Sequence, residues 1–221
     1  MQILYEDNHI IIVNKEAGEI VQGDKSGDTP LSDLVKSYIK ESCAKAGAVF
    51  LGVVHRLDRP VSGVVVFART SKALSRMNAM FRKGEVHKTY WALVDLQAGE
   101  IGVTHRLDHW LLRNEKHNKS YAYDHEVPGS KHAVLDYRFL AHYDRYTLVE
   151  VNLMTGRHHQ IRCQLSKVGM PIKGDLKYGA RRSNPDGSIS LVAKRVEFIH
   201  PVSKKTIRVE APNPFSFKFI I

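Results

Sequence analysis

Short runs of strand-forming apolar residues recur along the chain, and this recurrence limits the folds that it can adopt. Polar or turn-forming residues bound each run, which is typical of strands in a sheet. We predict a hairpin in which I-L-Y-E pairs with H-I-I-I-V across Asp7 and Asn8. Further strands are predicted at 49–54, 63–68, 88–96, 133–141, 146–153, 190–199 and 206–210.

Few segments show helical spacing. Thr29 and Pro30 suit the N-cap and the first position of a helix. The apolar residues that follow share one face, namely Leu31, Leu34, Val35, Tyr38 and Ile39. Further helices are predicted over 71–83, with Leu74, Met77 and Phe81 on one face, and over 157–168, ending at Gly169.

Many strands with few helices predict an α+β fold in one domain over residues 1–221. Its sheet should be mixed, mostly antiparallel and flanked by helices. The polar stretch 99–130 is hard to interpret and receives no element.

Positive charge is concentrated in two segments of this chain, whose net charge is +10 over 221 residues. Residues 55–90 hold eight Lys and Arg residues against two acids, and residues 154–182 hold seven against one. The remainder is close to neutral. Basic segments on a near-neutral body favour a polyanionic partner, although a basic surface can also serve solubility alone.

The sequence predicts a cytoplasmic protein. No run approaches the ~18 apolar residues of a membrane-spanning helix, and the N-terminus lacks the basic and apolar regions of a signal peptide. Cys43 and Cys163 are the only cysteines. They could pair, but two cysteines in such a chain indicate reduced thiols in a cytosol.

The segment H-R-L-D-R-P-V-S-G at 55–63 places a carboxylate between two arginines, on a loop between two predicted strands. Pro60 keeps the loop extended, and Gly63 permits a tight return into the next strand. Arg56 and Arg59 would hold Asp58 ionised and could grip phosphates. Asp58 could therefore act as a nucleophile or a general base, or simply form a structural ion pair.

A second basic segment, T-G-R-H-H-Q-I-R at 155–162, lies at a predicted strand-to-helix junction. Helix N-termini attract anions. Arg157 and Arg162 are five residues apart, so one could face phosphate while the other faces a carboxylate. Two solvated arginines on a surface helix are the alternative. His158 and His159 are adjacent, which suits joint metal ligation poorly, so no metal site is predicted.

A third segment is K-T-Y at 88–90. On a strand, Lys88 and Tyr90 share a face. A tyrosine among basic residues can stack on a nucleobase, although a half-buried strand tyrosine is the simpler interpretation.

Taken in this order, the three segments resemble the RluA-type family of RNA pseudouridine synthases. The resemblance extends to P-I-K-G-D-L-K-Y-G at 171–179 and to F-I-H-P at 198–201. It implies the pseudouridine synthase fold and an isomerase that needs no cofactor or metal. It also implies a structured RNA substrate, tRNA or rRNA. Family members often carry a separate N-terminal RNA-binding domain, which we do not expect here, and we expect a monomer.

The resemblance also implies roles for individual residues. Asp58 would be the catalytic carboxylate, either adding to the anomeric carbon or abstracting a proton to give a glycal. Tyr90 would pack against the uracil and assist the final deprotonation, and Arg162 would pair with Asp58. Arg56 would fill the space left by the extruded uridine. The remaining predicted substrate-binding residues are Arg59, Lys88, Arg157 and His159.

Three features depart from the family pattern or compete with it. Val61 stands where threonine is commoner, and Gln164 stands where histidine is common. The tetrapeptide H-R-L-D occurs again at 105–108. We interpret this second copy as coincidence in a mobile, peripheral insertion, where Arg106 could touch RNA and Asp108 has no catalytic role.

Two other functions are compatible with these residues. A non-catalytic RNA-binding protein could reuse the fold, although binding alone does not need a carboxylate facing a polyanion. A hydrolase could release the base, although such enzymes commonly use two carboxylates and no second acid lies close to Asp58 in the motif.

Overall fold

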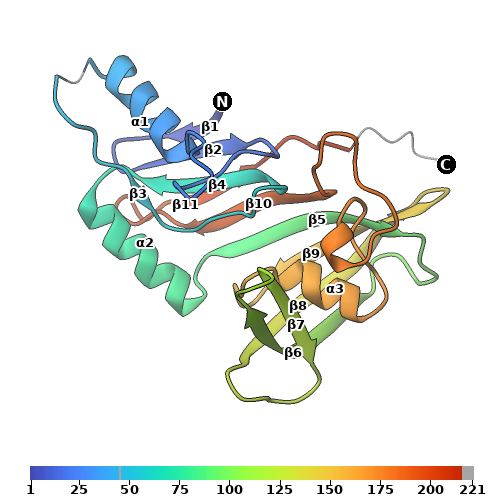
Figure 1. The fold of residues 1–221 in the computed structure, drawn as a ribbon. Helices are drawn as coiled ribbons and strands as arrows, with labels where there is room; N and C mark the ends of the chain where they lie inside the picture. The colour runs from blue at the N-terminus through green and yellow to red at the C-terminus, as the bar shows by residue number, and fades with distance from the viewer. Residues whose placement is uncertain (45, 216–221) are drawn as a thin grey trace. The chain divides into compact units, whose positions relative to one another are not determined.

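The computed structural model describes residues 1–44 and 46–215 and divides the chain into two compact units (Figure 1). The first unit contains Met1–His87 and Ala193–Pro212. The second contains Lys88–Val192 and the described residues 213–215. No helix of the described residues is long and apolar enough to cross a membrane.

The first unit contains strands in the order β1-β2-β4-β10. The pairs β1–β2, β2–β4, β3–β4 and β10–β11 are antiparallel. The predicted N-terminal hairpin is confirmed, and the strands predicted at 190–199 and 206–210 pair with each other as β10 and β11. The strands are β1 (Gln2–Glu6), β2 (Ile10–Lys15), β3 (Gly52–Val53), β4 (Ser62–Ala68), β10 (Leu191–Ile199) and β11 (Thr206–Glu210). The predicted strand at 49–54 is reduced to β3, the two residues that pair with β4.

Two helices complete the first unit. α2 (Ser71–Lys83) matches its prediction, and the Thr70 hydroxyl caps it by accepting the Ala73 amide. α1 begins at Leu31, with Pro30 as N-cap and no side-chain cap, so Thr29 is not the N-cap. Leu31, Val35 and Ile39 are buried, whereas Leu34 is 40% exposed, against prediction. The buried stripe is narrower than the apolar stripe of the sequence.

The sheet of the second unit has the order β5-β9-β8-β6-β7 and is antiparallel throughout. Strands β5, β8 and β9 confirm their predictions. The strands are β5 (His87–Asp95), β6 (Thr104–Asn114), β7 (Lys119–Tyr123), β8 (Lys131–His142) and β9 (Tyr146–Leu153). The helix α3 (Gln160–Lys167) and the short 3₁₀ helix η1 (Leu176–Tyr178) belong to the same unit. Leu111, Ala133, Cys163 and Tyr178 form a buried cluster between sheet and helices.

The polar middle of the chain is a regular hairpin and not a weakly ordered insertion. Leu107, His109 and Leu111 are buried, whereas Arg106 and Asp108, which alternate with them along the strand, are exposed. This alternation is the signature of a half-buried strand, and the abundance of polar residues concealed it. The helix predicted at 157–168 begins three residues late because His159 has a left-handed φ of 52°. Cys43 is exposed, Cys163 is buried, and both are free thiols.

Candidate active site

The Asp58 loop joins β3 to β4 in the first unit. Leu57 and Val61 are buried, Asp58 is half-buried, and Arg56 is exposed. The Val61 amide donates to the Asp58 carbonyl at 3.0 Å, which closes a tight turn. Apolar side chains thus anchor the loop on both sides of a carboxylate that solvent can reach.

Lys15, at the end of β2, fixes the backbone of this loop. Its side chain is fully buried, and Nζ donates to the carbonyl oxygens of Glu16 (3.0 Å), Arg59 (3.1 Å) and Val61 (2.6 Å). Burial lowers the pKa of Lys15 to about 8, opposed by the carboxylates of Glu19 and Asp58. Sequence reasoning missed this residue, although a lysine ending the buried run I-I-I-V-N-K was a visible signal.

The Arg59 side chain is directed to the segment before α1. It donates to Asp28 at 2.6 Å and to Ser26 at 2.8 Å, and Asp24 lies 3.8 Å away. The hydrogen bond from Arg59 lowers the pKa of Asp28, whereas the pKa of Asp24 is lowered first by its hydrogen bonds from Ser26 and then by Arg59. The bonds of Arg59 tie the Asp58 loop to a surface segment 31 residues earlier.

The imidazole of His55 supports the same loop from its other end. Nε2 accepts the Val66 amide at 3.0 Å, and the ring stacks on Phe81 with centroids 5.1 Å apart. The first residue of the motif is thereby joined to β4 and α2.

In the second unit, β5 carries Lys88 and Tyr90 on one face, as predicted. Tyr90 is only 8% exposed. Lys88 is half-buried, burial lowers its pKa, and a Cβ added at Gly156 would lie 3.6 Å from its ammonium. Lys88 is thus brought against the T-G-R-H-H segment of the sequence.

Arg162 lies in α3 and forms a buried two-point ion pair. Its Nε and terminal nitrogen donate to the two oxygens of Asp175 at 2.6 and 2.9 Å, and both side chains are at most 6% exposed. The guanidinium also lies 5.1 Å from the Tyr178 ring centre. Asp175 and Tyr178 come from the P-I-K-G-D-L-K-Y-G segment, to which the sequence had assigned no role.

His159 is buried in the same network. Its Nδ1 lies 3.0 Å from the Tyr178 hydroxyl, which accepts the Ser120 amide at 2.8 Å. Burial and the nearby charge of Arg162 lower the pKa of His159 to about 2, so this ring is neutral at physiological pH. Its ring stacks on His158 at 3.8 Å.

Arg157 is exposed, and its Nε donates to the His132 carbonyl at 2.8 Å. The eight predicted residues therefore fall into two groups, one in each unit. The first unit holds Arg56, Asp58 and Arg59. The second holds Lys88, Tyr90, Arg157, His159 and Arg162.

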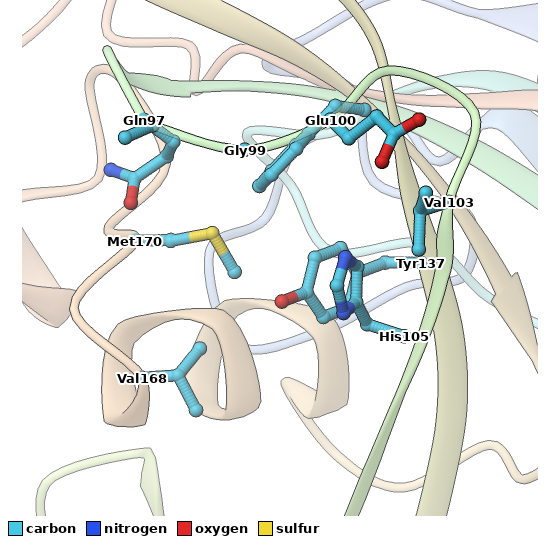
Figure 2. Close-up of a pocket in the computed structure, with 10 residues that line it drawn as sticks. Gln97, Gly99, Glu100, Val103, His105, Tyr137, Val168 and Met170 are labelled. Atoms are coloured by element: carbon cyan, nitrogen blue, oxygen red, sulfur yellow. The ribbon is translucent and has the colours of Figure 1, made fainter.

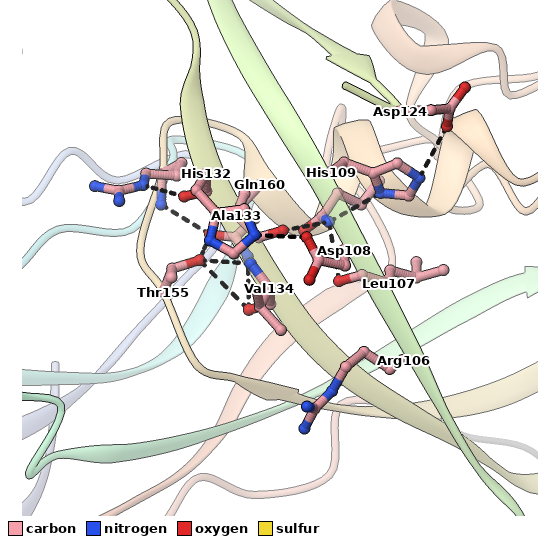
Figure 3. A network of polar contacts seen from close by, with 12 residues as sticks. Arg106, Leu107, Asp108, His109, Asp124, His132, Ala133, Val134, Thr155 and Gln160 are labelled. Atoms are coloured by element: carbon pink, nitrogen blue, oxygen red, sulfur yellow. Dashed lines mark hydrogen bonds and ion pairs between the residues drawn. The ribbon is translucent and has the colours of Figure 1, made fainter. Parts of the chain in front are cut away.

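The second H-R-L-D has a different environment (Figure 3). Arg106 forms a two-point ion pair with Asp136 at 2.7 and 3.0 Å, and Asp108 lies 2.6 Å from His132. Both acids lie on neighbouring strands at exposed or partly exposed positions. Gln164, the departure noted in the sequence, donates to the carbonyls of Leu107 and Ala133 and so holds α3 to this pair of strands.

An open pocket of about 360 Å³ lies in the second unit near the β5–β6 connection (Figure 2). Its wall includes the stacked rings of His105 and Tyr137, whose centroids are 5.1 Å apart, together with Val168 and Met170. None of the predicted site residues lines it. The chemistry indicated by the sequence therefore lies elsewhere.

Known structures define the fold as that of the pseudouridine synthases. "Human RNA Pseudouridylate Synthase Domain Containing 4" aligns with a TM-score of 0.77 over 96% of this chain and 88% of that chain, at 22% identity. "Human RNA Pseudouridylate Synthase Domain Containing 1" aligns with a TM-score of 0.73 over 97% and 84%, at 23% identity.

Sequence comparison gives the family. The RNA pseudouridylate synthase model matches residues 9–167. Ribosomal large subunit pseudouridine synthase D of Xylella fastidiosa is 32% identical over 97% of this chain and 66% of its own length. An uncharacterized RNA pseudouridine synthase of Bacillus subtilis is 32% identical over 99% and 70%. This chain therefore belongs to the RNA pseudouridine synthase family. It spans about two thirds of the length of the curated relatives that it matches.

Proposed function

We propose that this protein isomerises uridine to pseudouridine in structured RNA, with large-subunit ribosomal RNA as the first substrate to test. Family membership supports the reaction, and relatives are named as ribosomal large subunit enzymes. The observation that carries the proposal is a half-buried carboxylate, Asp58, on a loop whose backbone is held by the buried Lys15. A catalytic group must be held within a fraction of an ångström.

Each predicted residue has a defined task in this proposal. Asp58 acts at the sugar of an extruded uridine, by addition or by proton abstraction. Arg162 pairs with Asp58 and keeps it ionised, while Asp175 fixes the direction of the guanidinium. Tyr90 packs against the uracil, and Arg56 fills the gap in the RNA. Arg59, Lys88 and Arg157 contribute to the substrate-binding surface, and His159 contributes from beneath it through its contact with Tyr178.

The duplicated tetrapeptide offers a matched test. Asp58→Asn and Asp108→Asn make the same chemical change within the same four residues, one in the fixed loop and one on the exposed face of β6. We expect Asp58→Asn to abolish pseudouridine formation with RNA affinity changed only a few-fold, and Asp108→Asn to keep most activity. The measurement is single-turnover conversion of ribosomal RNA, followed by nucleoside analysis.

The same assay separates the competing functions. Free uracil would indicate a hydrolase, and binding without conversion would indicate an RNA-binding module. Activity of Asp58→Asn together with an inactive, folded Asp108→Asn would reverse the site assignment.

A further inference from the structure

The β6–β7 hairpin presents an uncompensated cluster of positive charge. Arg113, Lys116 and Lys119 lie at its end, and Lys177 of η1 joins them because its Nζ contacts the carbonyl oxygens of His117 and Asn118 at 3.4 and 3.0 Å. We call these four residues the hairpin patch. Glu115 is the only acid between His109 and Tyr123.

The charges of the hairpin patch are not neutralised by ion pairs within the part of the chain that the structure describes. Among residues 1–44 and 46–215, no carboxylate forms an ion pair with any of its four members. Arg106, on the same strand as Arg113, is by contrast held by Asp136 at two points. Clustered cations that lack acidic partners repel one another and create a positive potential. Such a potential attracts an anionic ligand.

The hairpin patch is joined to the network around Arg162. Asn118, in the hairpin turn, lies 3.1 Å from Nε2 of His158, and Ser120 contacts the same imidazole at 2.9 Å. The Lys119 ammonium and the Arg162 guanidinium each lie 5.1 Å from the centre of the Tyr178 ring. The strands β6 and β7 and the helix α3 all belong to the second unit.

An aromatic side chain completes the surface. Tyr121 is 41% exposed, and Lys119 lies over its ring at 5.6 Å. Proteins that bind single-stranded nucleic acid combine basic side chains with an exposed aromatic ring. The cations contact phosphates, and a base stacks on the ring.

We propose that the hairpin patch binds the phosphate backbone of the RNA strand that enters the site at Arg162. This proposal rests on the proposed function, because it takes RNA as the substrate. The sequence had assigned no role to any of these four residues, and the two basic segments that it singled out contain only Lys177 of them.

The test compares two double variants with the same loss of charge. Arg113→Gln with Lys116→Gln removes two members of the hairpin patch. Arg208→Gln with Lys36→Gln removes two cations that are paired with Glu210 and Asp33. The probe is a fluorescein-labelled RNA stem-loop with uridines in its loop, titrated by fluorescence anisotropy over a range of salt concentrations.

We expect the patch variant to lose about 10-fold in affinity at low salt and to reduce the salt slope by roughly 1.4 to 1.8, since each phosphate contact contributes about 0.7 to 0.9. The control should bind like the unmodified protein. Equal affinity and slope in the two variants would overturn the proposal. Binding to anionic phospholipid vesicles is measured in parallel. A patch variant that loses binding to these vesicles but binds RNA normally would also overturn the proposal.

Turnover distinguishes this proposal from the proposed function. We expect the patch variant to raise KM with kcat unchanged, because the patch binds RNA away from the reacting atoms. Absence of pseudouridine in every protein tested would contradict the proposed function, while the anisotropy comparison would still test the patch.

Discussion

At the scale of single residues, the site depends on buried polar groups that hold other groups in place. Lys15 gives its three hydrogen bonds to backbone carbonyls around Asp58, and Asp175 gives both oxygens to Arg162. Such groups are costly to bury unless every bond is made. Their burial therefore fixes the geometry of the residues they contact.

His159 provides a pH-dependent prediction at this scale. Its pKa is lowered to about 2 in the folded protein, against about 6.5 in the unfolded chain. Below pH 6.5 the unfolded chain therefore binds a proton that the folded one does not. The contribution of His159 to the free energy of unfolding is therefore complete above pH 6.5 and is lost as the pH falls towards 2. The free energy of unfolding changes through this group by up to about 1.4 kcal/mol per pH unit.

We expect His159→Gln to remove this contribution to the slope. The measurement is urea unfolding of both proteins between pH 7 and about 4.5, the interval below the unfolded pKa. Parallel curves for the two proteins would show that His159 is accessible to protons in the folded state.

At the scale of elements, the start of β4 determines where the Asp58 loop ends. Gly63 has φ 113°, and a Cβ there would lie 2.3 Å from the Ala193 carbonyl oxygen of β10. The loop can return into the sheet at this point because the residue lacks a side chain.

We predict that Gly63→Ala lowers the free energy of unfolding by about 3 kcal/mol or more, from left-handed strain and overpacking together. Gly84→Ala is the matched control, because Gly84 has φ 73° and an added Cβ there would meet nothing within 4 Å, so this substitution should cost only about 1 kcal/mol. The measurement is chemical denaturation. A similar loss in both variants would mean that β10 moves aside without cost.

At the scale of the whole molecule, the predicted chemistry requires residues of both units, Asp58 from the first and Arg162 from the second. We predict that Arg162→Ala lowers kcat by about 10²-fold and changes RNA affinity far less. Because the change leaves Asp175 buried without Arg162, circular dichroism must confirm folding, and Arg162→Lys serves as the charge-retaining variant. Lost affinity with unchanged turnover at saturation would instead make Arg162 a phosphate contact.

The local sequence was sufficient to predict the strands and helices with a regular apolar pattern and to locate the motifs. The strands β2, β4, β5 and β9 and the helix α2 follow from runs and spacings within a few residues, since apolar side chains are buried in a sheet or helix wherever it forms. The motif residues could also be named, because each motif is contiguous.

Contacts between distant residues were decided only by the tertiary structure. No local pattern shows that Lys15 reaches the carbonyl of Val61, 46 residues later, or that Asp175 pairs with Arg162. The two H-R-L-D copies are identical as strings, yet one lies in a fixed loop and the other on an exposed strand face. The difference arises because burial and hydrogen bonding depend on which strands become neighbours, and that pairing is a property of the whole chain.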